Sequence, residues 1–168
     1  MTNAQLTRYD RRMQEIMNRR EAAPLYATAG RRRVLVAVHI GLTVATVTAG
    51  LAADIGGSMV AMWVMLALVL PWCIATGAIN ASTRGLLELR RRVLDERQRA
   101  ERSEVLARAH RITTGLLFAV AATVIGYGLA GGSTGRPALM ALIVGFVAHW
   151  LMPMWVAGLR AQDEPDDE

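Results

Sequence analysis

Four long apolar stretches dominate the pattern of hydrophobic and polar positions along the chain. They cover residues 34–53, 59–79, 112–130 and 137–159. Each has close to the ~20 residues that a helix needs to cross about 30 Å of hydrocarbon. The pattern predicts an all-α polytopic membrane protein in a single membrane domain. Its four transmembrane helices form two hairpins, and helical extensions continue into the cytoplasm.

The basic residues predict the orientation of these spans. All 19 are arginine, and 17 of them lie in segments 1–33 or 80–111. The positive-inside rule therefore places both segments, and with them both termini, in the cytoplasm. The absence of lysine beside abundant glycine and alanine is typical of a GC-rich genome, which favours the bacterial inner membrane.

The net charge of +5 does not indicate a nucleic-acid partner. The arginines flank membrane spans instead of forming one basic face with interleaved aromatic residues, so we expect no nucleic-acid binding. Anionic lipid headgroups are the expected counter-ions, and a partner protein is the alternative. The candidate contacts with lipid or partner are Arg31, Arg32, Arg33, Arg90, Arg91 and Arg92.

The first cytoplasmic segment, 1–33, has apolar residues at helical spacing, which predicts a short amphipathic helix. Pro24 and Gly30 are expected to interrupt it before the first span. The helix either lies on the lipid surface or docks onto a partner, and a disordered segment is the third alternative. The apolar positions are Leu6, Tyr9, Met13, Ile16 and Met17.

The second cytoplasmic segment, 80–111, predicts a helical linker with one reversal of direction. Asp95 and Gln98 have the spacing of a capping box, so the turn is expected near 94–95 and a new helix from Glu96 into the third span. Before the turn, the helix of the second span is expected to extend into the cytoplasm through Leu86, Leu87, Leu89 and Val93. Ion pairs Glu88–Arg92 and Glu104–Arg108 would support both extensions. The acidic tail, 160–168, is expected to be disordered.

Small residues recur at every fourth position of the first span. Such a face lets two helix backbones approach closely in lipid, where packing replaces the hydrophobic effect. It predicts either packing against another span of this chain or the seam of a homo-oligomer. The candidate helix-packing face is Ala37, Gly41, Ala45, Ala49 and Ala53.

The two halves of the chain also resemble each other. Residues 45–47 and 50–52 recur as 122–124 and 128–130, and Pro71 is matched by Pro153. If the chain arose by duplication, the halves are parallel repeats related by an axis along the membrane normal.

Few polar residues lie inside the spans, and two histidines are the candidate intramembrane polar site. His39 lies about two turns from the cytoplasmic arginines and His149 near the middle of the fourth span, so the pair is unsuited to one haem iron. A zinc site would lack its remaining ligands, and the single cysteine, Cys73, is expected to be a small buried hydrophobe. We therefore expect neither a metal nor a cofactor.

No span contains an acidic residue, and the chain has no Gly-x-Ser-x-Gly or His-Glu-x-x-His motif. Enzymatic activity is therefore not expected.

In residues 92–98, Arg-Val-Leu-Asp-Glu-Arg-Gln, the chain resembles small uncharacterised bacterial membrane proteins with two hairpins and an Asp-Glu-Arg linker. The resemblance implies the four-span fold and, by analogy, an accessory role. The leading hypothesis is a non-enzymatic accessory or regulatory subunit that uses its arginine-rich cytoplasmic helices. The alternatives are a small oligomeric transporter or channel lined by His149 and threonines and, more remotely, a haem-binding redox protein.

Overall fold

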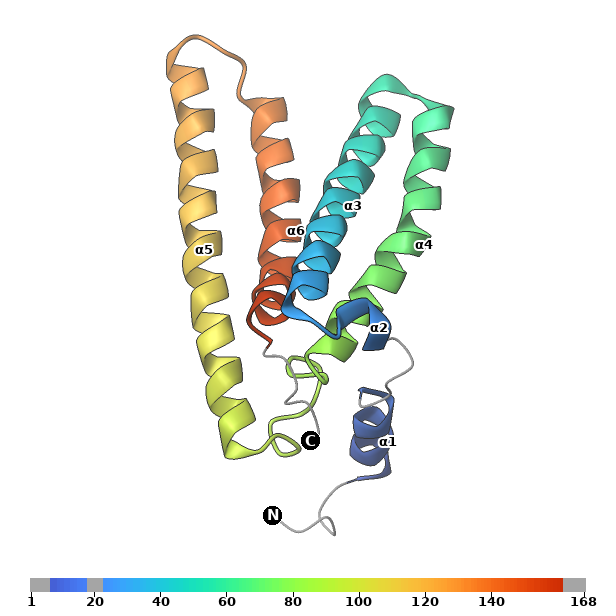
Figure 1. Ribbon diagram of the computed structural model, residues 1–168. Coiled ribbons are helices and arrows are strands. Elements are labelled where there is room, and N and C mark those ends of the chain that lie inside the picture. The colour runs from blue at the N-terminus through green and yellow to red at the C-terminus, as the bar shows by residue number, and fades with distance from the viewer. Residues whose placement is uncertain (1–6, 18–22, 162–168) are drawn as a thin grey trace.

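The four apolar stretches form four long helices in the computed structural model, which describes residues 7–17 and 23–161 (Figure 1). These helices are long and apolar enough to cross a membrane, which confirms the all-α polytopic class. The predicted acidic tail beyond residue 161 and the predicted apolar position Leu6 lie outside the described residues. The helices are α1 (Arg8–Met17), α2 (Ala23–Tyr26), α3 (Ala29–Gly56), α4 (Met59–Ser82), α5 (Glu96–Leu129) and α6 (Gly135–Arg160).

The long helices form two antiparallel hairpins, α3 with α4 and α5 with α6. Figure 1 shows that the hairpins meet at one end and spread apart towards the other. We call the end that carries residues 83–95 the linker end, and the end that carries the turns at 57–58 and 130–134 the loop end. Gly57, with φ +60°, closes α3 in the left-handed conformation, which makes the short turn into α4 possible.

The buried side chains of the long helices gather at the linker end. Those of α3 lie no further than Thr43, those of α4 begin at Ala75, and those of α5 lie no further than Thr113. In α6 they begin at Leu151, apart from the single position Gly145. The hairpins are therefore joined to each other by the linker-end half of the bundle.

The expected extension of α4 through Val93 is wrong, because α4 ends at Ser82 and residues 83–95 form successive turns. Arg84 and Gly85 have φ values of +50° and +69°, a left-handed conformation that ends a helix. The chain then folds beneath the bundle and buries apolar side chains that a continuing helix would have left in water. The buried leucines are Leu86, Leu89 and Leu94, with 4%, 5% and 2% of their surface exposed.

The predicted capping box at Asp95 is present. The Asp95 carboxylate accepts from the Gln98 backbone N–H at 2.7 Å, and the Gln98 side chain accepts from the Asp95 N–H at 3.1 Å. These bonds satisfy N–H groups that a helix start leaves without partners. Helix α5 therefore begins at Glu96 and continues through the third span, as the sequence predicts.

The expected ion pairs Glu88–Arg92 and Glu104–Arg108 are replaced by contacts of Arg92 and Glu104 with residues on other helices. Arg92 lies 2.6 Å from Asp10 of α1, and Glu104 accepts from Arg160 at the end of α6, also at 2.6 Å. The linker-end charges thus connect separate elements instead of supporting single helices.

Candidate functional site

A cluster of polar and aromatic side chains lies where the two hairpins meet. Helix α3 contributes His39 and Thr43, and α4 contributes Trp72 and Thr76, in both cases four residues apart. Helix α6, from the other hairpin, contributes Trp155. His39 is fully buried, and its ring centroid lies 5.1 Å from that of Trp72 and 6.2 Å from that of Trp155. We call these five residues the His39 cluster.

Hydrogen bonds in this cluster determine which ring nitrogen of His39 carries the proton. The Trp155 indole N–H, which can only donate, donates to Nδ1 of His39 at 2.9 Å. Nδ1 therefore carries no proton, and the neutral ring donates from Nε2 to Oγ1 of Thr76 at 2.9 Å. The Thr76 hydroxyl in turn donates to the Trp72 carbonyl oxygen at 2.9 Å. The ring is held as the Nε2–H tautomer, and neither nitrogen is left to ligate iron.

A second chain of hydrogen bonds closes the cluster. The Trp72 indole N–H donates to Oγ1 of Thr43 at 2.9 Å, and that hydroxyl donates to the carbonyl oxygen of His39 at 2.8 Å. Each donor named here has its acceptor, so the polar groups are accommodated among apolar helices. The arrangement can hold α3, α4 and α6 in one register.

His149, the other predicted intramembrane candidate, does not join His39. It is exposed on α6, one turn before Pro153. The described residues contain no group of three or more His, Cys, Asp or Glu side chains that could hold a metal ion. Cys73, expected to be buried, is exposed on α4, and that expectation is wrong.

Arg32 is wrongly assigned to the lipid or partner contacts, because only 4% of its surface is exposed. Its guanidinium donates to the carbonyl oxygens of Tyr26 at 3.1 Å and Ala161 at 2.6 Å. It therefore connects the start of α3 to the residue that follows α6. Its neighbours Arg31 and Arg33 are exposed.

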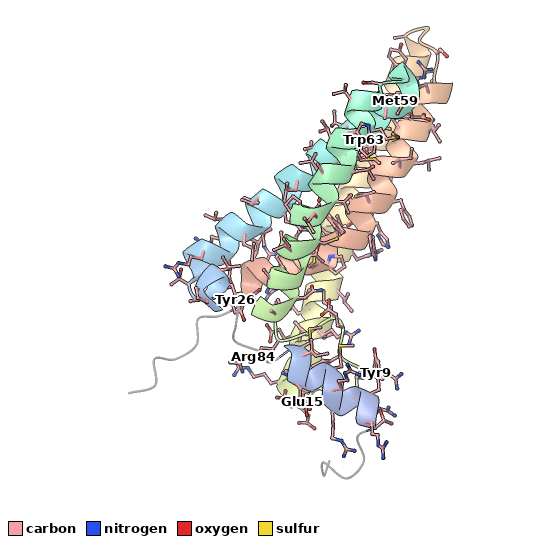
Figure 2. The ribbon with its side chains drawn as sticks, turned by 90° about the vertical axis from the view of Figure 1, so that its right-hand side faces the viewer. Tyr9, Glu15, Tyr26, Met59, Trp63 and Arg84 are labelled. Carbon is pink, nitrogen blue, oxygen red and sulfur yellow. The ribbon has the colours of Figure 1, made fainter. Side chains whose placement is uncertain are left out.

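The three linker arginines also remain exposed, and two of them contact α1, the helix that carries Tyr9 and Glu15 in Figure 2. Asp10 of α1 lies 2.6 Å from Arg92 and 3.9 Å from Arg90, whose guanidinium also lies 5.0 Å from the centroid of the Tyr9 ring. Only 1% of the Asp10 side chain is exposed. The predicted amphipathic helix thus docks onto this chain's own linker.

The electrostatics of this contact favour a charged Asp10. Burial by itself would raise the pKa of the Asp10 carboxyl, but hydrogen bonds from Thr7 and Arg92 and the charge of Arg92 lower it below its ordinary value of 3.8. Both the Thr7 backbone N–H and its hydroxyl donate to Oδ2, at 3.0 Å and 2.7 Å. The contact is therefore an ion pair at neutral pH.

The predicted helix-packing face on α3 is largely uncovered in the single chain. Ala37, Gly41 and Ala45 are exposed, and Ala49 and Ala53 are partly buried. A Cβ atom built on Gly41 would meet nothing within 4 Å. At these three exposed positions, the expected packing against another span of this chain is not found.

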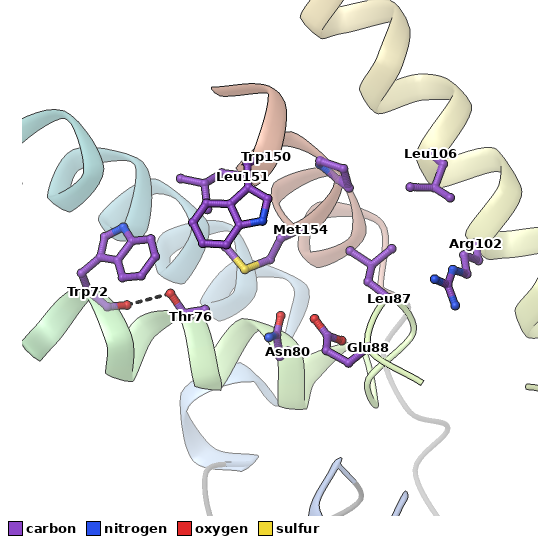
Figure 3. Close-up of a pocket in the computed structure, with 11 residues that line it drawn as sticks. Trp72, Thr76, Asn80, Leu87, Glu88, Arg102, Leu106, Trp150, Leu151 and Met154 are labelled. Carbon is purple, nitrogen blue, oxygen red and sulfur yellow. Dashed lines mark hydrogen bonds between the residues drawn. The ribbon is translucent and has the colours of Figure 1, made fainter. Parts of the chain in front are cut away.

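A cavity of about 280 Å³ lies beside the His39 cluster, between α4, α5, α6 and the linker. Trp72 and Thr76 belong to both. Figure 3 shows Asn80 and Glu88 on one side of the cavity and Arg102 reaching in from α5. Sequence reasoning did not single out Asn80, Glu88 or Arg102 as one group, because they lie on three separate elements.

The charges of this cavity are partly shielded from water. Glu88 is exposed over the residue as a whole, yet burial of its carboxyl raises the pKa above its ordinary value of 4.5. The charge of Arg102 and hydrogen bonds from the backbone N–H groups of Leu87 and Glu88 lower the pKa of Glu88, but by less than burial raises it. The Arg102 guanidinium is held by a 2.7 Å bond from Nη1 to the Leu89 carbonyl oxygen.

Compared with known proteins, the chain matches no protein-family model, no curated protein and no solved structure. Its function therefore has to be argued from its own residues. The sequence held one unused signal for the His39 cluster. The pairs His39 with Thr43 and Trp72 with Thr76 each place two hydrogen-bonding side chains on one helix face.

Proposed function

We propose that this protein is a non-enzymatic accessory or regulatory subunit of the bacterial inner membrane. It acts by association, and its arginine-rich linker end faces the cytoplasm as the contact surface. The proposal rests on the exposed guanidinium groups of the linker. Arg90 and Arg92 keep 57% and 43% of their side-chain surface exposed although both lie within 4 Å of Asp10.

Charge complementarity would give this surface its specificity. A partner with acidic residues would be steered to the exposed arginines, and the effect would weaken as salt rises. The neighbouring Arg91 is exposed as well, and its carbonyl oxygen accepts from Arg99 at 3.0 Å, which fixes the backbone beneath it. The surface is thus preorganised, which lowers the entropy lost on binding.

Within the bilayer, the exposed small residues of α3 supply a second contact surface. Ala37, Gly41 and Ala45 would allow a helix of a partner or of a second copy to approach closely. The partners in this proposal are therefore anionic lipids and a membrane protein. A homo-oligomer, in which a second copy of the chain takes the partner's place, is the alternative to it.

Photo-crosslinking in the native membrane tests the proposal. A photoreactive amino acid at Arg91 should capture one partner in stoichiometric yield, and Arg90→Gln with Arg92→Gln should abolish capture. Arg136→Gln provides the matched control, because Arg136 is exposed at the loop end. Recovery of only the chain itself, or equal capture by the control and the double variant, would contradict the proposal.

A small oligomeric transporter or channel is the second candidate, favoured by the buried polar groups of the His39 cluster. Polar residues inside a membrane often belong to ion or substrate pathways. Solute flux in liposomes that falls in His39→Ala or His149→Ala would support transport. A haem-binding protein, the remote alternative, would show a Soret band on purification.

A further inference from the structure

We propose that the cavity between the hairpins binds the headgroup of a zwitterionic phospholipid that carries a primary ammonium group. Arg102 would bind the phosphate, and Glu88 with Asn80 would accept hydrogen bonds from the ammonium. This inference concerns a lipid site and does not depend on the proposed accessory role.

The cavity spans the boundary between apolar helices and the polar linker end. Trp72 and Trp150 line it from the apolar spans, whereas Glu88 lies on the linker and Arg102 near the start of α5. Trp150 follows His149 near the middle of the fourth span, so the cavity extends from the apolar part of the helices to the charged groups at the linker end. A phospholipid meets the same change, from acyl chain to charged headgroup, over the same depth.

The opposite charges of Arg102 and Glu88 favour a zwitterionic headgroup over an anionic one. A guanidinium presents five N–H donors in a fork that matches phosphate oxygens, and only one donor of Arg102 is used by the Leu89 carbonyl oxygen. A carboxylate nearby would repel an anionic headgroup but would accept from an ammonium. The Asn80 side chain beside Glu88 offers an oxygen to the same group (Figure 3). A choline headgroup cannot donate such hydrogen bonds.

Size and access fit a headgroup rather than a whole lipid. The volume of about 280 Å³ lies just below the range of about 300–1,000 Å³ that is typical of sites for whole ligands. Leu106 and Trp150 line the cavity and are 42% and 66% exposed, so the cavity is reached from outside the bundle. The acyl chains would then lie against the outer surfaces of the helices.

Native mass spectrometry of the full chain tests this site. The purified protein in detergent is titrated with phosphatidylethanolamine, phosphatidylglycerol or phosphatidylcholine of identical acyl chains. We expect phosphatidylethanolamine to bind about tenfold more tightly than either other lipid, as one charge-assisted hydrogen bond would give. Equal binding of the three lipids would overturn the proposal.

Variants assign the binding to the cavity. Glu88→Gln should bring the preference for phosphatidylethanolamine over phosphatidylglycerol close to one, and Arg102→Gln should weaken all three lipids about tenfold. Arg108→Gln is the control, because Arg108 is an exposed residue of α5 outside the cavity. An unchanged preference in Glu88→Gln, or an equal effect of Arg108→Gln and Arg102→Gln, would refute the site.

A second variant keeps the test decisive if Arg102→Gln does not fold. Leu106→Trp narrows the cavity without altering its charges, and we expect it to lose the binding of phosphatidylethanolamine. The ratio measured for Glu88→Gln compares lipids on one protein, so a partial loss of stability cancels. Undiminished phosphatidylethanolamine binding by Leu106→Trp would count against a site in the cavity.

Discussion

The linker end and the loop end of the same four helices are built differently. At the linker end, α3, α4 and α6 share the His39 cluster, and the chain between the hairpins contributes buried leucines. At the loop end the two hairpins lie apart (Figure 1), and large apolar side chains are exposed, among them Leu129 at 85%. The hydrocarbon core of a bilayer can cover exposed apolar groups, but it offers no partners for hydrogen bonds. Specific interactions are therefore concentrated where the hairpins must recognise each other.

The largest difference between the two ends should come from truncated leucines. Leu86→Ala removes a side chain from the buried cluster that also contains Val105, Met152 and Val156, and should lower the free energy of unfolding by about 2–5 kcal/mol. Leu142→Ala, at an exposed position towards the loop end, should change it by no more than about 0.5 kcal/mol. Unfolding in mixed detergent micelles, followed by circular dichroism, measures both. Similar losses in the two variants would remove the distinction between the ends.

The His39 cluster should have the next largest effect. His39→Phe keeps an aromatic ring, but the Trp155 indole N–H loses its acceptor and the Thr76 hydroxyl loses the N–H that donates to it. The free energy of unfolding should fall by about 1–3 kcal/mol. His149→Phe is the matched control, because His149 is exposed. The same unfolding measurement applies, with the fluorescence of Trp72 and Trp155 as a local readout. A stability unchanged by His39→Phe would mean that the cluster does not join the hairpins.

Two glycines test how tightly each end is packed. A Cβ atom at Gly158 would lie 3.0 Å from Cγ2 of Val36 and 3.1 Å from Cγ2 of Ile79, both buried and β-branched. Gly158→Ala should therefore lower the free energy of unfolding by about 1 kcal/mol. At Gly126 a Cβ atom would meet nothing within 4 Å. Gly126→Ala should therefore raise the free energy of unfolding by up to about 1 kcal/mol, because alanine has the higher helix propensity. Thermal unfolding of the two variants should shift in opposite directions.

The smallest effect should be local to α1. Asp10→Asn removes the ion pair with Arg92 and should release α1 from the linker while the unfolding of the long helices stays unchanged. A spin label at Glu15→Cys, in a Cys73→Ser background, would report this release as faster motion in electron paramagnetic resonance spectra. A label that is equally immobile with and without the Asp10→Asn substitution would show that the ion pair does not hold α1.

The same label should respond to acid. Because the pKa of Asp10 is lowered in the folded chain, the contact is fully present above its ordinary pKa of 3.8 and is lost as pH falls through the lowered value. We expect the label to become mobile only below about pH 4. The spectrum of Asp10→Asn should not change with pH over this interval. Mobility that changes near neutral pH would point to a different group.

Local patterns in the sequence were sufficient for much of the fold. The four spans and the start of α5 at Glu96 follow from apolar stretches and from a capping box of four adjacent residues, and the structure confirms them. The segment after Ser82 was not predictable in the same way. Its leucines at helical spacing favour a helix, yet their burial under the bundle stabilises a series of turns instead. Tertiary burial outweighed local propensity there.

The candidate site was less accessible to sequence reasoning than the fold. His39 was identified as an intramembrane polar residue, but its partners Thr76 and Trp155 lie 37 and 116 positions along the chain. Arg32 belongs to an arginine run typical of lipid contacts, although it is buried against the carbonyl oxygen of Ala161. The identity of a residue does not indicate which distant group will lie beside it.

The sequence by itself determined that the chain has four membrane-spanning helices in two hairpins, because an apolar run of sufficient length has to satisfy its backbone within a helix. It also determined where α5 begins, because capping is local. Only the tertiary structure decided which ends of the hairpins meet, which arginine is buried, and that Glu88 and Arg102 line one cavity. These features depend on contacts between residues far apart in the chain, whose energies no local pattern contains.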